Sequence, residues 1–161
     1  MKIELLDLFL DRFTMHRLTL YSLIALILWA LALSLVGVLH YSALDIAGGT
    51  ALAVGVSLAV NLAFARTLHA TTDMESTVIM ALILVLIVPL GLAEHAVFIG
   101  AASAVATASK YIVTVDKQHV FNPAALALVA LGLLFPQFAA SWWVGTTSML
   151  PAVIVFGTLV A

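Results

Sequence analysis

The polar residues best suited to holding a ligand lie in one short stretch of an otherwise apolar sequence. Lys110 and Lys117 precede the letters FNPA at 121–124, and an apolar run follows. Asparagine is a preferred N-cap and proline is favoured at the first helical position, so Asn122 and Pro123 predict a helix start. The positive end of such a helix suits an anion or a polar group, and the lysines would add charge beside it. Taken alone, the pattern establishes a helix start, and polar-ligand binding is the chemistry that its residue types support.

A second polar segment, TTDMEST at 71–77, precedes another apolar run. Thr72 and Glu75 match the Thr-x-x-Glu capping box, in which a hydroxyl and a carboxylate satisfy the first free backbone donors. Such a cap matters in a membrane, because water is scarce there for unpaired amides. We therefore predict that Glu75 caps a helix, while Ser76 and Thr77 are available to meet a ligand at the cytoplasmic mouth.

Other polar residues give little sign of catalysis. The pair Glu94-His95 lies between two apolar runs and is interpreted as a solvated turn, with a proton relay or ion site as the alternative. The remaining histidines lack helical metal-ligand spacing, which argues against a metal site. There is no Ser-His-Asp order, glycine-rich phosphate loop or dinucleotide fingerprint. Few ionisable residues lie within the apolar runs, which argues against a proton-driven carrier.

The composition excludes a water-soluble protein. Hydrophobic residues make up 65% of the 161 residues, and charged residues only 9%. Soluble domains carry about 25% charged residues, so the chain is predicted to be an integral membrane protein. The absence of cysteine excludes disulfides, thiolate-bound zinc and iron–sulfur clusters held by this chain alone. No basic cluster points to nucleic acid.

The apolar runs predict an all-α fold, a polytopic helix bundle of about six transmembrane helices. Residues 1–17 are predicted to form an amphipathic helix at the membrane interface or a plain lead-in, and residues 18–161 the transmembrane domain. The last run is too short to span at about 1.5 Å per residue, so we expect a truncated C-terminus. Gly48, Gly49 and Gly55 predict close helix contacts. The expected spans lie at about 18–39, 46–65, 76–92, 95–110, 121–136 and from 148 onward.

The basic residues all fall on one side of this predicted topology, because five alternating crossings separate them. The positive-inside rule then places the N-terminus in the cytoplasm and the protein in the cytoplasmic (inner) membrane. Trp142 and Trp143 fall on the opposite side, where they are interpreted as interfacial anchors of an aromatic belt. The basic residues are Lys2, Arg12, Arg17, Arg66, Lys110 and Lys117.

A set of short motifs also occurs in a fixed order. A polar stretch leads into an apolar helix ending in proline, followed by a small-residue helix ending in Ala-Lys, a polar loop, Phe-Asn-Pro-Ala, an apolar helix, Phe-Pro and Ser-Trp. Here these are Asp73–Pro89, Ala108–Lys110, Phe121–Ala124, Phe135-Pro136 and Ser141-Trp142. The ordered set resembles the family of the D subunit of the Rnf electron-transport complex and the B subunit of the sodium-pumping NADH:quinone reductase.

The resemblance implies a flavin-dependent function. Members of the family couple electron transfer from reduced ferredoxin or NADH to ion movement across the membrane, and they carry flavin. It also implies a larger fold of about ten helices built as an inverted repeat similar to urea channels. On this basis we expect FMN or riboflavin at Lys110, Phe121, Asn122 and Pro123. Other subunits of an electron-transport complex, or a fused or partner flavin reductase domain, are the expected partners within the lipid bilayer.

The sequence departs from the family's pattern at three places. The loop before Phe121 lacks glycine, and the paired prolines after the third span are reduced to Pro89. In the family the threonine of a Ser/Thr-Gly-Ala-Thr motif carries FMN through a phosphoester, and here the nearest string is VGTT at 144–147. Thr147 is therefore a candidate cofactor residue by position. We expect no covalent attachment there and interpret Thr146 and Thr147 as caps of the last helix.

The chain is thus predicted to be a component of a redox-driven ion-translocating oxidoreductase rather than a stand-alone enzyme. Two other functions stay open. A channel or carrier for a small neutral solute would use the same architecture without redox chemistry, and the scarcity of buried charge favours it. A scaffold for partner subunits would use the amphipathic N-terminal segment to bind another chain.

Overall fold

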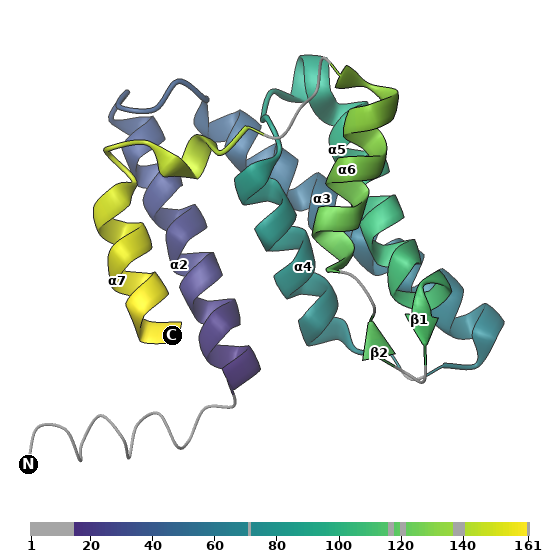
Figure 1. The fold of residues 1–161 in the computed structure, drawn as a ribbon. Helices are drawn as coiled ribbons and strands as arrows, with labels where there is room; N and C mark the ends of the chain where they lie inside the picture. The colour runs from purple at the N-terminus through teal and green to yellow at the C-terminus, as the bar shows by residue number, and fades with distance from the viewer. Residues whose placement is uncertain (1–14, 71, 116–117, 120–121, 137–140, 161) are drawn as a thin grey trace, which may run out of the picture.

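The computed structural model describes residues 15–70, 72–115, 118–119, 122–136 and 141–160. Within these ranges the chain forms six α-helices, one 3-10 helix and one pair of two-residue antiparallel strands (Figure 1). The helices are α2 (Met15–Leu35), α3 (Ala43–Leu68), α4 (Met74–Ile87), α5 (Leu92–Ile112), α6 (Pro123–Leu134), η2 (Trp143–Gly145) and α7 (Leu150–Val160), and the strands are β1 (Thr114–Val115) and β2 (Gln118–His119).

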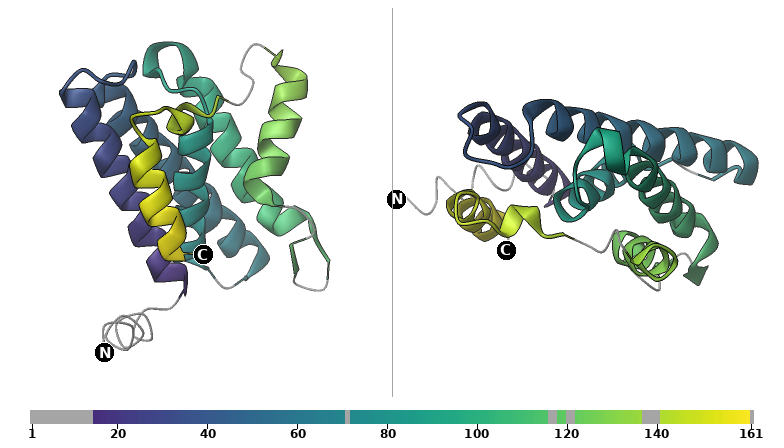
Figure 2. Two further views of the ribbon diagram at one scale, coloured as in Figure 1. Left: turned by 60° about the vertical axis from the view of Figure 1, so that its left-hand side comes forward. Right: turned by 90° about the horizontal axis from the view of Figure 1, so that it is seen from above.

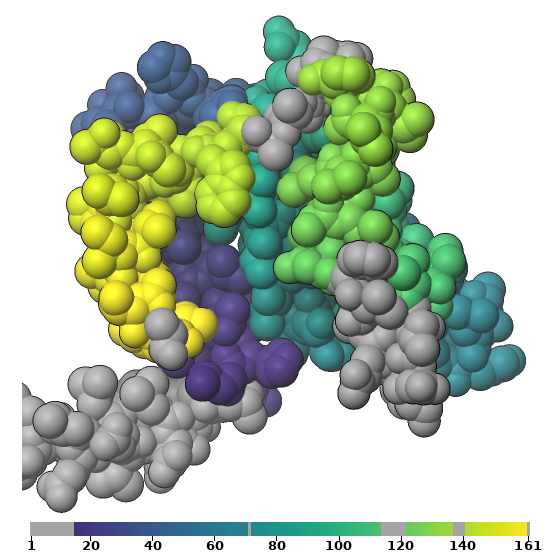
Figure 3. All heavy atoms as spheres, viewed as in Figure 1, coloured from purple at the N-terminus to yellow at the C-terminus, as the bar shows by residue number. Residues whose placement is uncertain are grey.

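Helix α3 forms the back of the bundle and packs against both α4 and α5. Helix α6 lies on α5 and touches α4, whereas α7 packs on α2 and on η2. The view from above shows α6 and α7 on the same side of the bundle, with a wide separation between them (Figure 2). Part of α4 is therefore visible at the bottom of a depression between α6 and α7 (Figure 3).

Among the described residues, three helices are long and apolar enough to cross a membrane, which fits a helical membrane protein. They are α2, α3 and α5, with 21, 26 and 21 residues. Helices α4, α6 and α7 have 14, 12 and 11 residues. At 1.5 Å per residue they extend about 21, 18 and 17 Å, short of a hydrocarbon core of roughly 30 Å. The all-α fold is thus confirmed and the apolar helices fit a membrane protein, while six full crossings stay a prediction.

The amphipathic segment predicted at 1–17 lies mostly outside the described residues. Its last three residues, from Met15 to Arg17, already belong to α2. The domain boundary predicted between residues 17 and 18 therefore falls inside this helix.

Helix α4 ends because Pro89 lacks the N–H that would continue it. In a continued helix that N–H would bond to the carbonyl of Val85. The indole Nε1 of Trp143 donates to this carbonyl instead, at 2.9 Å, and the N–H of Ser141 donates to the carbonyl of Ile87, also at 2.9 Å. The segment from Ser141 to η2 thereby satisfies backbone acceptors that a membrane would leave without water.

Trp143 is consequently not an interfacial anchor, and that part of the aromatic-belt prediction is wrong. Its side chain is 5% exposed and makes an edge-on contact with Tyr41 at a ring-centroid distance of 5.9 Å. Trp142 is 71% exposed, as an anchor would be.

The predicted close helix contacts occur at two of the three glycines. A Cβ on Gly49 would lie 2.9 Å from Cδ2 of Leu90, and a Cβ on Gly48 would overlap Leu92. The contacts bring α3 against Leu90 in the link between α4 and α5 and against Leu92, the first residue of α5. Gly55 has open space around it, so the prediction is wrong at this position.

Asp45 links the start of α3 to the start of α5. Its Oδ2 accepts a 2.6 Å hydrogen bond from the Ser42 hydroxyl, and its Oδ1 accepts from the backbone N–H of Leu92 at 3.0 Å. One carboxylate in the first turn of α3 therefore also serves the first turn of α5, whose N-cap residue Gly91 has no side chain to do so.

Candidate ligand-binding groove

Helix α6 begins as predicted, with Asn122 as its N-cap and Pro123 in the first turn. The Oδ1 atom of Asn122 accepts from the N–H groups of Ala124 at 3.0 Å and Ala125 at 3.5 Å. Because the amide oxygen is turned toward the helix, the Nδ2 atom with its two N–H groups is turned away from it. The cap therefore leaves two donors at the positive end of α6.

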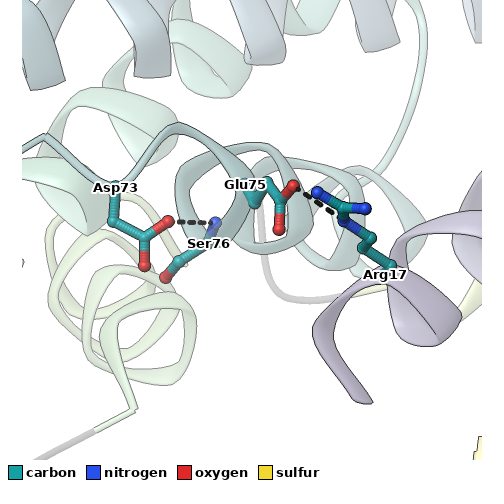
Figure 4. A network of polar contacts seen from close by, with 4 residues as sticks. All are labelled: Arg17, Asp73, Glu75 and Ser76. Atoms are coloured by element: carbon teal, nitrogen blue, oxygen red, sulfur yellow. Dashed lines mark hydrogen bonds and ion pairs between the residues drawn. The ribbon is translucent and has the colours of Figure 1, made fainter. Parts of the chain in front are cut away.

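Helix α4 begins differently from the prediction. Its N-cap is Asp73, whose Oδ1 accepts from the N–H of Ser76 at 3.0 Å (Figure 4). Asp73 immediately precedes the helix, so its carboxylate reaches the cap position, whereas Thr72 lies one residue too early. Glu75 is turned to the other side and pairs with Nε of Arg17 at 3.4 Å (Figure 4). The capping box of Thr72 and Glu75 is therefore wrong.

Lys110, in the last turn of α5, reaches across to the start of α4. Its Nζ donates to Oγ of Ser76 at 3.1 Å and to Oγ1 of Thr77 at 3.3 Å. A lysine ammonium has three donors, so one N–H remains after these two bonds. No carboxylate among the described residues forms an ion pair with Lys110.

The end of α5 is held in place by the residue that follows Lys110. The hydroxyl of Tyr111 donates to Oδ1 of Asn61 at 2.6 Å, and its ring stacks on Phe64 at a centroid distance of 5.4 Å. Asn61 is fully buried and also donates from Nδ2 to the sulfur of Met74 at 3.9 Å. These contacts bind α5 to α3 at the level where Lys110 meets α4.

A groove of about 260 Å³ lies where the starts of α4 and α6 meet the end of α5. The first turns of α4 and α6, which contribute to its lining, are at the lower ends of these helices in Figure 1. Polar residues from all three helices line its lower end, and apolar side chains of α4 continue upward from them. The lining residues are Ser76, Ile79, Met80, Ile83, Lys110, Asn122, Pro123 and Ala124.

The described basic residues gather at this end of the bundle. Arg17 pairs with the first turn of α4, Arg66 lies in the last turn of α3, and Lys110 contacts the first turn of α4. These three residues therefore lie at one end of the bundle, and the side of the membrane that this end faces stays a prediction. Lys2, Arg12 and Lys117 lie outside the described residues.

Folding thus brings together three of the five predicted site residues. Lys110, Asn122 and Pro123 line one groove, whereas Phe121 lies outside the described residues. Thr147 is exposed and follows η2, which is attached to Val85 near the far end of α4. Val85 comes nine residues after Ser76, about 14 Å along the helix axis. Thr147 therefore lies at the opposite end of the bundle.

Two further polar pairs lie away from the groove. Glu94 and His95 lie in the first turn of α5 rather than in a solvated turn, and the N–H groups of both bond to the carbonyl of Gly91. The start of α7 uses the backbone carbonyl of Thr146, which accepts from Met149 and Leu150 at 3.0 Å each.

Sequence reasoning named Ser76 and Thr77 only as general ligand candidates. Their contact with Lys110 crosses more than thirty positions of the chain. Nothing in the local pattern indicates this pairing, since it follows from the packing of α5 against α4. The apolar wall formed by Ile79, Met80 and Ile83 could have been recognised in the sequence, because the spacing of these residues places them on the helical face of Ser76.

Comparisons of the chain with family models, with curated proteins and with solved structures gave no match.

Proposed function

We propose that the chain is the membrane part of a flavin-dependent electron-transport system, similar to the Rnf D and sodium-pumping reductase B subunits, which couples electron transfer to ion movement. One observation carries this proposal. Lys110 and the Asn122–Pro123 pair, which belong to separate motifs of the resemblance, line one groove at the basic end of the bundle. A flavin bound there supplies one- and two-electron transfer, and the protein contributes position and electrostatics.

The donor set of the groove suits one end of a flavin. Lys110, Ser76 and Asn122 present N–H and O–H groups, which can bond to ring carbonyls or to a phosphate. Ile79, Met80 and Ile83 offer an apolar wall to an aromatic ring. The volume of about 260 Å³ is below the roughly 300–1,000 Å³ of common ligand pockets, so part of the cofactor would extend out of the open side.

The charge distribution supports the proposed orientation. Because Arg17, Arg66 and Lys110 share one end, the positive-inside rule favours a cytoplasmic groove and N-terminus in the inner membrane. A cytoplasmic groove would be accessible to a flavin reductase domain or to another subunit of the complex, and these are the proposed partners.

The test is the flavin content of protein purified from its native membrane with a mild detergent. We expect a flavin absorbance band that disappears on denaturation and removal of small molecules, because no covalent bond is proposed. Lys110→Gln should lose most of the flavin, whereas Arg66→Gln, which removes an exposed cation at the same end, should retain it. Wild-type protein without flavin would contradict the proposal.

A channel or carrier for a small neutral solute is the second candidate. It is favoured by a set of buried, uncharged polar side chains on the three packed helices α3, α4 and α5, since such groups would suit a neutral solute. Solute flux into liposomes that needs no reductant would support this function over electron transport. The buried polar residues on these three helices are Ser57, Asn61, Thr77, Ser103, Thr107 and Ser109.

A further inference from the structure

The polar end of the groove presents hydrogen-bond donors, because the acceptor atoms of the same residues already accept hydrogen bonds within the protein. The Oδ1 of Asn122 accepts from the start of α6, which leaves Nδ2. The Oγ of Ser76 accepts from Lys110, which leaves its own hydrogen, and Lys110 keeps its third N–H. Within the described residues none of these three donor groups has a further hydrogen-bond acceptor. Such a surface selects a ligand rich in acceptors.

The charge of the groove further narrows the range of ligands that it could bind. Lys110 contributes a positive charge, and none of the described lining residues is acidic. Of the two nearby carboxylates, Glu75 pairs with Arg17, whereas Asp73 caps α4 and also offsets part of the charge of Lys110 (Figure 4). The positive ends of the α4 and α6 dipoles lie here together with the negative end of α5, whose last turn carries Lys110. An anion with several oxygen acceptors fits these conditions.

The other half of the groove is apolar. Ile79, Met80 and Ile83 rise along α4 directly above Ser76, and Ala124 lies on the α6 side. A free inorganic anion would leave this wall uncovered. The complementary ligand therefore has an anionic end on Lys110 and an apolar body along α4.

We propose that the groove is a recognition site for a phosphate group carried on an apolar body. The phosphate accepts from Lys110, Ser76 and Asn122, and the body covers the α4 wall. Two sources have this chemistry, the phosphate of FMN and the headgroup phosphate of an anionic phospholipid. The inference uses the groove of the proposed function but does not depend on the flavin itself.

The test uses the full chain, freed of flavin and reconstituted in nanodiscs of zwitterionic lipid. FMN and riboflavin are titrated in parallel by fluorescence, because they differ only in the phosphate. In a second arm, native mass spectrometry counts retained anionic phospholipid after exchange against zwitterionic lipid. Each arm is run on the wild type and on three variants: Lys110→Gln, Asn122→Asp and Arg66→Gln.

Asn122→Asp is the sharpest of these variants. Aspartate is as good an N-cap as asparagine, so the start of α6 is kept, but the Nδ2 donors become an oxygen acceptor that repels phosphate. We expect this variant and Lys110→Gln each to weaken phosphate-ligand binding by about tenfold or more, the loss of a charge-assisted hydrogen bond. Arg66→Gln should change it by less than about twofold, because an exposed, distant charge is screened. Unchanged unfolding temperatures would show that the variants fold.

The outcomes separate the two proposals. FMN binding tighter than riboflavin binding, and dependent on Lys110, supports both. Retention of anionic phospholipid with the same dependence, but no binding of either flavin, supports the phosphate site and contradicts the flavin function. Riboflavin binding as tight as FMN binding overturns the phosphate site and leaves the flavin function standing. An equal effect of Arg66→Gln and Lys110→Gln, or no binding of either phosphate compound, also overturns it.

Discussion

The two ends of the bundle differ in the hydrogen-bond donors that they leave without an acceptor among the described residues. At the end that carries Trp143, polar groups are bonded within the fold: the indole N–H to Val85, the Ser141 N–H to Ile87, and the Asp45 carboxylate to the start of α5. At the basic end, helix caps and cross-helix hydrogen bonds leave unused donors on Lys110, Ser76 and Asn122, which line a groove.

The difference separates polar groups that hold the bundle together from polar groups that are left to bind. Both ends contain polar residue types that are common in ligand-binding sites. What distinguishes them is that Lys110, Ser76 and Asn122 at the basic end keep donors with no acceptor among the described residues. This comparison predicts that substitutions at the Trp143 end lower stability, and that substitutions at the basic end lower ligand binding.

The largest loss of stability is expected for Trp143→Ala. It removes a buried ring and leaves the Val85 carbonyl without its donor, so the free energy of unfolding should fall by about 3–5 kcal/mol. Trp143→Phe should lose about 1–3 kcal/mol of this, chiefly the hydrogen bond. Denaturant titration in mixed micelles measures both.

A second variant tests whether this bond replaces the one that Pro89 lacks. In a Pro89→Ala background, residue 89 regains an N–H for Val85, so Trp143→Phe should cost less than in the wild type. Trp142→Phe, at an exposed position, is the control and should change stability by less than about 0.5 kcal/mol. Equal costs of Trp143→Phe in the two backgrounds would show that the bond has a different role.

Gly49→Val should lower the free energy of unfolding by about 1–3 kcal/mol, because even its Cβ would lie 2.9 Å from the buried Leu90. Gly55→Ala is the matched control in the same helix, where no atom lies within 4 Å of the added Cβ. It should be neutral or stabilising by up to about 1 kcal/mol, from helix propensity. A thermal melt in detergent compares the two, and similar losses would contradict the close packing at Gly49.

A smaller effect is expected for Asp45→Ala, about 1–2 kcal/mol, because the Leu92 N–H loses its acceptor while water can partly replace it at the bundle end. Asp45→Asn keeps a carbonyl oxygen in place and should recover part of the loss. Hydrogen exchange at the first turn of α5 measures the effect locally. Unchanged exchange in Asp45→Ala would show that the carboxylate does not fasten this helix.

The smallest effect is expected for Thr147→Val. Thr147 is exposed and distant from the groove, so both the unfolding temperature and the flavin content should stay within error of the wild type. Fluorescent flavin that survives denaturation in the wild type and disappears in this variant would overturn that expectation and place a covalent cofactor at the Trp143 end.

The sequence predicts most of the fold because apolar runs and helix-start residues are local signals. The run predicted at about 76–92 forms α4 at Met74–Ile87, and Asn122 caps α6 as its type indicates. The misassigned cap at Thr72 is also local, since two plausible caps stand side by side and the geometry of the entering chain decides between them. Local pattern gives the helices, therefore, with an error of a few residues at their ends.

The site is predictable only in part, because its defining contacts are distant in sequence. Asn122 was recognisable alone, whereas the bond from Lys110 to Ser76 depends on how α5 packs against α4. Trp143 shows the same limit. Tryptophan is typical of a membrane interface, but here the carbonyl of Val85 lacks the N–H of residue 89 and accepts from the buried indole of Trp143 instead.

The most direct test of the two-ended account measures ligand content and stability together in Lys110→Gln and Trp143→Phe. Both variants are purified in the same mild detergent, and flavin per folded protein and the unfolding temperature are determined on each sample. We predict that Lys110→Gln loses the flavin at an unchanged unfolding temperature, and that Trp143→Phe keeps the flavin while its unfolding temperature falls. The reverse pattern, with flavin lost from Trp143→Phe and retained by Lys110→Gln, would contradict the assignment of binding to the basic end.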